Sequence, residues 1–183
     1  DLLAQAEHDP DAVPVLVTPS EKLARQVASE LEHRLKALAT SEVASLSVSR
    51  SAVAVLVSDL EEAVRVANRR APEHLELHVR EPGRIKEKLR NFGTLFIGPL
   101  SVEGLGDYSA GVNHTLPTNT TARYTGGLSA LDFVKLATTL EVDARGMEKI
   151  GPAALKMAEA EGLAAHAASV RERLESSGRG DEK

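Results

Sequence analysis

Two short motifs place side chains of metal-binding or acid–base type close together in the sequence. Gln5 and His8 stand three residues apart in a helix-like opening, so both could reach one ion. The alternative is a helix C-terminus that favours His8 through the helix dipole, and the pair by itself favours that alternative. Glu73 and His74 are adjacent, and reference pKa values of about 4.3 and 6.5 suit general acid–base chemistry. A charged turn explains this dipeptide equally well.

A glycine-rich stretch from Gly98 to about Leu128 carries a third group of polar side chains. Its glycines permit close backbone approach, so Asp107 and His114 could face a common point. The stretch is not a phosphate-binding loop, because it has neither the G-x-G-x-x-G spacing nor a P-loop lysine. Glu161 and His166 lie five residues apart nearer the C-terminus, where a solvated helical face is the better explanation.

The elements that must position these residues alternate between short β-branched runs and longer amphipathic runs. We predict strands over Val13–Val17, Val53–Val57, Leu75–Val79 and Thr94–Ile97. Helical patterns follow three of these runs, after Thr18 or Ser20, after Ser58 or Asp59, and from Pro82 to Leu89. The pattern predicts an α/β fold of Rossmann-like βα units with a mainly parallel sheet, followed by a small helical C-terminal tail.

The remaining segments complete the predicted organisation. A serine-rich connector precedes Val53, and the glycine-rich stretch has no periodicity. In the tail we expect a strand over Thr138–Val142 and helices over Ala153–Ala160 and Leu163–Leu174. The predicted domains are 1–130, which is α/β and incomplete at its N-terminus, and 131–183, which is mainly helical.

Composition excludes several classes of protein. The 183 residues are 42% hydrophobic with a net charge of -5 and no cysteine, which excludes thiol nucleophiles, cysteine zinc sites and iron–sulfur clusters. The acidic balance and scarcity of aromatic residues argue against nucleic acid as a partner. Without a predicted membrane segment or signal peptide, we expect a cytoplasmic protein. The first residue is Asp1, which indicates a chain that begins inside a longer protein.

Taken together, the motifs resemble the histidinol dehydrogenase family over essentially the whole chain, in the same order and with similar gaps. They are Gln5-Ala-Glu-His8, Ala71-Pro-Glu-His-Leu75, Gly106-Asp-Tyr-Ser-Ala-Gly-Val-Asn-His-Thr-Leu-Pro-Thr118, Gly127-Leu-Ser129 with Asp132-Phe133, and Glu161 with His166. The resemblance implies an NAD-dependent, zinc-containing oxidoreductase of L-histidine biosynthesis. It would oxidise L-histidinol to L-histidine through L-histidinaldehyde with two NAD.

The resemblance also implies roles for individual residues. Glu73 would activate water and His74 would be the general base. Four side chains would bind zinc in a homodimer with shared active sites, the last supplied by the partner subunit: Gln5, His8, Asp107 and His166. The substrate contacts would be these four ligands together with His74, His114 and Glu161. The family's NAD-binding residues belong to a region outside this chain, so none is assigned.

Two other functions remain open from the residues. One is a zinc-binding or dimerisation module without catalysis, because the cofactor half is missing from the chain. The other is a zinc hydrolase in which Glu73 activates water for bond cleavage. The chain lacks the H-E-x-x-H spacing of many zinc proteases, which ranks the hydrolase last.

Overall fold

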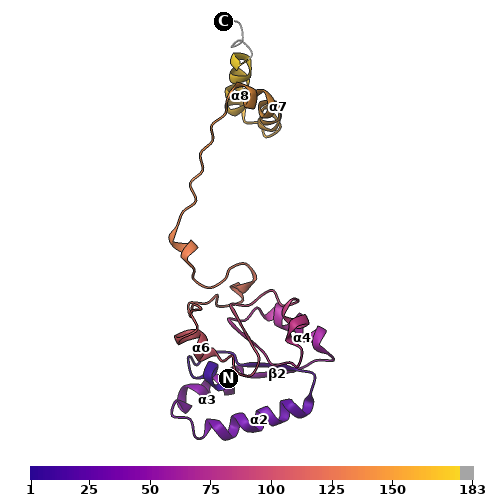
Figure 1. Cartoon of the computed structure of the whole chain (residues 1–183), viewed down its shortest axis with the longest axis vertical. Coiled ribbons are helices and arrows are strands. Elements are labelled where there is room, and N and C mark those ends of the chain that lie inside the picture. Colours follow the sequence, from indigo (N-terminus) through magenta and orange to yellow (C-terminus); the bar gives the residue numbers. More distant parts are fainter. Residues whose placement is uncertain (178–183) are drawn as a thin grey trace. The chain divides into compact units, whose positions relative to one another are not determined.

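The chain forms two compact units, Asp1–Val134 and Lys135–Lys183. The computed structural model describes residues 1–177, and Figure 1 follows the path of the chain from indigo to yellow. None of the helices among the described residues is both long enough and apolar enough to cross a membrane.

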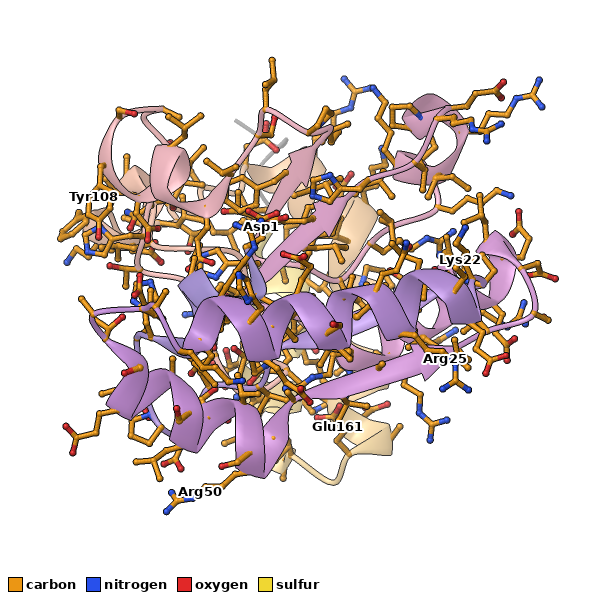
Figure 2. All side chains as sticks on the ribbon, turned by 90° about the horizontal axis from the view of Figure 1, so that it is seen from below. Asp1, Lys22, Arg25, Arg50, Tyr108 and Glu161 are labelled. Atoms are coloured by element: carbon orange, nitrogen blue, oxygen red, sulfur yellow. The ribbon has the colours of Figure 1, made fainter. Side chains whose placement is uncertain are left out.

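The first unit opens with helix α1 (Leu2–Ala6) and a parallel βαβ arrangement. Strand β1 (Val15–Thr18) pairs in parallel with β2 (Val53–Leu56), so that Val15 lies opposite Val53. Helix α2 (Glu21–Leu35) follows β1, and the Leu23 amide donates a hydrogen bond of 3.2 Å to its N-cap residue, Ser20. Lys22 and Arg25 on α2 point outward (Figure 2), which leaves its apolar side for the sheet.

The serine-rich segment before β2 is a helix, α3 (Ser41–Ser51), and our prediction of a connector there is wrong. Serine disfavours helix interiors because its hydroxyl competes for backbone hydrogen bonds. Here the buried Ser47 hydroxyl donates to the Ala12 carbonyl oxygen at 3.0 Å, which satisfies the hydroxyl against another segment. Ala44 is buried on the same face. Tertiary packing therefore overrides the local preference.

A second parallel pair forms the other half of the unit. Its elements are α4 (Leu60–Arg70), β3 (His74–Leu77), α5 (Pro82–Lys86) and β4 (Thr94–Ile97). The Glu62 amide donates to the Asp59 carboxylate at 2.7 Å, which caps α4, and β3 pairs with β4 so that His74 lies opposite Thr94. The α/β class with parallel strands is thereby confirmed.

The four described strands form two separate two-stranded sheets, β1–β2 and β3–β4. A core of Val64, Leu77 and Leu89 joins α4 to the second sheet. Strand β2 remains largely exposed, with Val53 at 50% and Leu56 at 54% of their full accessibility. Continuous apolar strands are normally covered on both faces, so β2 is unusual for its sequence.

The glycine-rich stretch contains helical structure that its composition and lack of periodicity did not predict. A short helix, α6 (Glu103–Tyr108), and a 3₁₀ helix, η1 (Thr121–Arg123), lie within it, and a second 3₁₀ helix, η2 (Ala130–Phe133), follows just after it. A Cβ atom added to Gly106 would lie only 2.8 Å from the Phe96 ring. Glycine at this position therefore lets α6 approach β4 closely.

The second unit is a helical hairpin of α7 (Ala144–Ala160) and α8 (Ala164–Ser177), which agrees with the helical tail expected from the sequence. A Cβ atom added to Gly151 of α7 would lie 2.7 Å from the Leu174 side chain, so the helices pack closely there. The strand predicted over Thr138–Val142 is wrong: among the described residues this segment has no strand partner. A β-branched run needs such a partner to satisfy its backbone.

Candidate active site

His74 begins strand β3 and is the centre of the candidate site. Helix α4 ends at Arg70, and the left-handed backbone of its C-cap residue Ala71 (φ 50°) turns the chain toward the strand. The ring of His74 lies 5.9 Å from the ring of Phe96 on the neighbouring strand, and its side chain is only 13% exposed. The sheet and Phe96 together hold the imidazole in a largely dry position.

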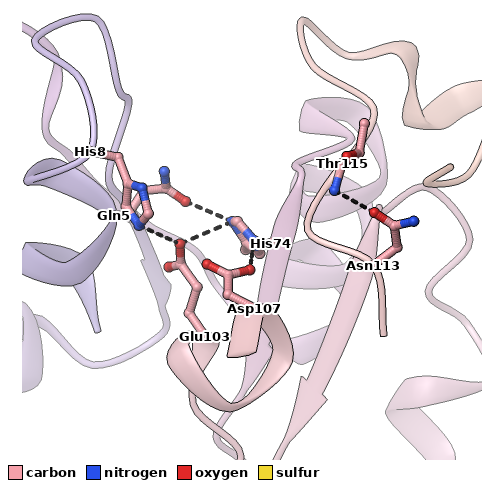
Figure 3. A network of polar contacts seen from close by, with 7 residues as sticks. All are labelled: Gln5, His8, His74, Glu103, Asp107, Asn113 and Thr115. Atoms are coloured by element: carbon pink, nitrogen blue, oxygen red, sulfur yellow. Dashed lines mark hydrogen bonds and ion pairs between the residues drawn. The ribbon is translucent and has the colours of Figure 1, made fainter. Parts of the chain in front are cut away.

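Residues from three parts of the first unit surround this imidazole (Figure 3). Gln5 comes from α1 and His8 follows the same helix, while Glu103 and Asp107 stand four residues apart on α6. The structure thus brings four of the residues singled out from the sequence together with one that was not, Glu103.

One hydrogen bond defines the protonation pattern of the His74 ring. Nδ1 lies 2.8 Å from Oε1 of Gln5, and because an amide oxygen only accepts, Nδ1 is the donor. In the neutral ring, Nε2 then carries the free lone pair. Nε2 is buried with no hydrogen-bond partner among residues 1–177, and Oδ1 of Asp107 lies 4.0 Å away from it. A buried nitrogen with a free lone pair can accept a proton from a bound substrate, as a general base does.

The surroundings of His74 also favour its neutral form. Burial lowers the pKa of the imidazole below its ordinary value of 6.5, and nearby His8 lowers it further, while the charge of Asp107 acts in the opposite direction. The ring is therefore mainly uncharged near pH 7, as a general base must be.

Glu103 is the buried carboxylate of the cluster, only 4% exposed. Its Oε1 lies 3.4 Å from Nε2 of His8 and 3.5 Å from Nδ1 of His74, yet it makes no hydrogen bond within the described part of the chain. Burial raises the pKa of this carboxyl group above 4.5, and His8 opposes the rise. Sequence reasoning missed Glu103, although its i, i+4 spacing from Asp107 on a helix would have been a signal.

The cluster offers donors that fit a metal ion. Ligand atoms of His8, Glu103 and Asp107 all lie within 4.8 Å of one another. Imidazole nitrogen and carboxylate oxygen are common zinc ligands and need no cysteine. The unpartnered Oε1 of Glu103 shows that this pocket has more electron-pair donors than protein hydrogens to satisfy them, which fits a cation.

Glu73 lies immediately before β3, half-buried, and its carboxylate makes no hydrogen bond or ion pair with the described residues. Burial raises its pKa, and the charge of Arg70 opposes that rise. A cavity of about 1700 Å³ opens beside the cluster, and Gln5, Glu73, His74 and Glu103 are among the residues that line it. Both members of the predicted catalytic pair therefore border one cavity.

The other predicted site residues are not gathered there. His114 is exposed in the loop after α6 and makes no hydrogen bond or ion pair with the cluster among the described residues. Its neighbour Asn113 is held in place, accepting a hydrogen bond from the Thr115 amide at 2.7 Å (Figure 3). Glu161 and His166 are exposed residues of the second unit, at the end of α7 and on α8.

The fold and the cluster define an α/β protein with a histidine–carboxylate centre suited to a cation and to proton transfer. The chain belongs to the histidinol dehydrogenase family, whose model matches residues 1–174, as the motifs predicted.

Individual relatives agree with this assignment. The chain is 45% identical to "Histidinol dehydrogenase 1" of Nostoc sp. and 47% identical to "Histidinol dehydrogenase" of Chlorobium luteolum, over 96% and 95% of its length. A crystal structure of histidinol dehydrogenase from Elizabethkingia anophelis superimposes with a TM-score of 0.84 at 38% identity and covers 96% of this chain. The chain spans only 41%, 39% and 40% of these three proteins.

Proposed function

We propose that this chain forms part of the active site of a zinc-containing, NAD-dependent histidinol dehydrogenase, which oxidises L-histidinol to L-histidine through L-histidinaldehyde. The observation that carries the proposal is the buried His74 ring, which donates from Nδ1 and keeps Nε2 free beside a cluster of metal-ligand type. Membership of the family supplies the substrate.

His74 would act as the base in the first oxidation. Its Nε2 would take the hydroxyl proton of L-histidinol, and NAD, when bound, would supply the hydride acceptor for oxidation to the aldehyde. Asp107, with Oδ1 4.0 Å from Nε2, then stabilises the positive charge that the ring acquires. The lowered pKa of His74 supports this role, because it favours the neutral imidazole that can accept a proton.

Glu73 would act in the second oxidation. Its carboxylate would remove a proton from the water that adds to the aldehyde carbon. A second NAD, when bound, would supply the hydride acceptor for oxidation of the hydrate to the carboxylate of L-histidine. Burial raises the pKa of Glu73 and so strengthens it as a base. Its position on the cavity that also borders His74 supports the proposal that both groups act on one substrate.

Gln5, His8 and Asp107 would hold zinc, and His166 from the partner subunit of a homodimer would complete the set. When bound, zinc supplies a Lewis acid that orients the amino alcohol. We further propose that His114 and Glu161 contact the substrate, and that the protein works in the cytoplasm. The dimer proposal explains why the exposed His166 stands on a helical hairpin of its own.

The test is NADH formation from L-histidinol by the full-length protein. We expect His74→Ala and Glu73→Gln each to lower kcat by at least about 100-fold, while His33→Ala, an exposed histidine on α2, serves as the control and leaves it unchanged. Zinc content is measured in parallel to show that each variant keeps its site. Unchanged turnover in His74→Ala contradicts the role of His74, and zinc binding without any NADH from the unaltered protein would favour a binding module.

A further inference from the structure

Glu103 is the one member of the cluster to which neither motif nor proposed reaction assigns a role. It is 4% exposed, and burying a carboxylate is costly unless a donor or a cation faces it. Oε1 nevertheless has no hydrogen-bond partner within residues 1–177. A buried carboxylate without a hydrogen-bond partner costs stability, so the groups that face it indicate what it does.

Two imidazoles face this oxygen. Nδ1 of His74 lies 3.5 Å away and Nε2 of His8 lies 3.4 Å away, both somewhat longer than an N–H···O hydrogen bond (Figure 3). The Nδ1 hydrogen of His74 points instead to Oε1 of Gln5, at 2.8 Å. The described structure therefore places two acceptors, an amide and a carboxylate, around one ring hydrogen.

Gln5 is also a proposed zinc ligand, and its amide oxygen is the donor atom it can offer. If Gln5 holds zinc through that oxygen, its hydrogen bond to His74 would weaken or be lost. The carboxylate of Glu103 is the acceptor that remains within a small movement of Nδ1. A carboxylate there keeps the hydrogen on Nδ1, keeps the lone pair on Nε2, and stabilises the ring after it has taken a proton.

We infer that Glu103 is a positioning residue that accepts the Nδ1 hydrogen of His74 in the zinc-loaded protein and so holds the imidazole in the tautomer with a free Nε2. The inference rests on the proposed function, because it gives His74 the role of base. In this arrangement Glu103 accepts from Nδ1, and Nε2, the other ring nitrogen, is left to accept the proton of the substrate hydroxyl. Glu103 itself touches no reacting atom.

The first measurement is the tautomer of His74, read from ¹⁵N-histidine NMR spectra of the zinc-loaded full-length protein, with the signal assigned through His74→Asn. We expect the hydrogen on Nδ1 in the unaltered protein and in the control Glu32→Gln, an exposed carboxylate on α2. Glu103→Leu, which removes the acceptor, should shift the ring toward the Nε2-protonated form. An unchanged tautomer in Glu103→Leu overturns the inference.

The second measurement is a double-mutant cycle on kcat. We expect Glu103→Leu to lower kcat by about 10- to 100-fold in the unaltered background and to have almost no further effect in His74→Asn. An equal loss in both backgrounds overturns the inference, because Glu103 would not act through His74. If Glu103→Leu does not fold, Glu103→Gln replaces it in the same cycle. This variant keeps the shape of the side chain and an amide oxygen as acceptor, so a smaller loss of kcat is expected.

The third measurement separates positioning from metal ligation. Zinc affinity and the visible spectrum of the cobalt-substituted protein should be nearly unchanged in Glu103→Gln. A changed cobalt spectrum with a large loss of affinity would make Glu103 a ligand and overturn the positioning role. If the unaltered protein forms no NADH from L-histidinol, the proposed function fails, and the NMR result still decides what Glu103 does to His74.

Discussion

Among single residues, Asp107 has a carboxylate with two possible roles, as a metal ligand and as the charge beside His74. Its ligand atom belongs to the group with His8 and Glu103 that could hold a cation, and its Oδ1 is 4.0 Å from Nε2 of His74. It is the charge that raises the pKa of His74 against the effect of burial. A neutral amide of the same size would serve both purposes poorly.

We predict that Asp107→Asn lowers the zinc affinity of the full-length protein by about 10- to 100-fold or more, because an uncharged amide is a weaker ligand than a carboxylate. A competition titration with a chromophoric chelator measures this. Asp11→Asn, at an exposed aspartate of the same unit, is the control. Equal affinities in the two variants would remove Asp107 from the ligand set.

Glu73 gives a prediction about stability and pH. Its pKa in the folded protein is raised above 4.5. At a pH between the unfolded and the folded pKa, the native carboxyl group therefore still holds a proton that the unfolded chain has released. The free energy of unfolding of the wild-type protein consequently falls as the pH rises from the unfolded pKa of Glu73 through its folded pKa. Glu73→Gln lacks this loss, so its Tm should match wild type near pH 4 and exceed it slightly at pH 7.

Thermal unfolding of the metal-free protein across this pH range tests the prediction. The exposed Glu32→Gln should track wild type at every pH. A wild-type Tm above that of Glu73→Gln at pH 7 would mean that the carboxylate has a stabilising partner that offsets its burial.

At the scale of elements, α6 determines where two carboxylates of the cluster lie. The helix is only six residues long and depends on its packing against β4 rather than on its own propensity. Gly106 makes that packing possible, because an added Cβ would lie 2.8 Å from the Phe96 ring. The same ring packs against His74, so Phe96 links the helix that carries the acids to the strand that carries the base.

Two glycine substitutions in α6 should therefore have opposite effects. Gly106→Ala should lower the free energy of unfolding by about 1–3 kcal/mol through overpacking against Phe96, and should weaken zinc binding by displacing Asp107. A Cβ atom added to Gly104 has no neighbour within 4 Å, so Gly104→Ala should raise the free energy of unfolding by about 0.5–1 kcal/mol through helix propensity. Denaturant unfolding with a zinc titration measures both. Similar effects at the two positions would contradict the close approach of α6.

At the scale of the whole molecule, much of the apolar surface of the first unit lacks a covering layer. Val53 and Leu56 on β2 are half exposed, and a cavity of about 1700 Å³ opens between the elements. The relatives are more than twice as long as this chain, which covers about 40% of them. We interpret the bare strand as a surface that the remainder of such a protein covers.

The isolated 183-residue chain should consequently bind more of a hydrophobic dye such as ANS, per mole, than the full-length protein, and should form no NADH from L-histidinol. Substitution of Leu56→Gln should reduce dye binding by the isolated chain much more than that by the full-length protein. Equal dye binding by isolated and full-length chains would show that β2 is not covered by further sequence.

The α/β class, most of the helices and strands, and the family could be predicted from the sequence, because the alternation of apolar residues and the short polar motifs are local properties of the chain. It did not predict helix α3 or α6. Serine-rich and glycine-rich segments have weak local preferences, and only packing, such as Ser47 against Ala12 or Gly106 against Phe96, decides their conformation.

The tertiary structure alone decided the membership and orientation of the site. Gln5 and His74 are 69 residues apart, and only folding makes Nδ1 a donor and leaves Nε2 free. Glu103 looks like any acidic residue in the sequence, and it becomes significant because α6 turns it inward between two imidazoles. The sequence gives the type of each residue. Its burial and the atoms that face it depend on contacts between segments that are distant in the sequence.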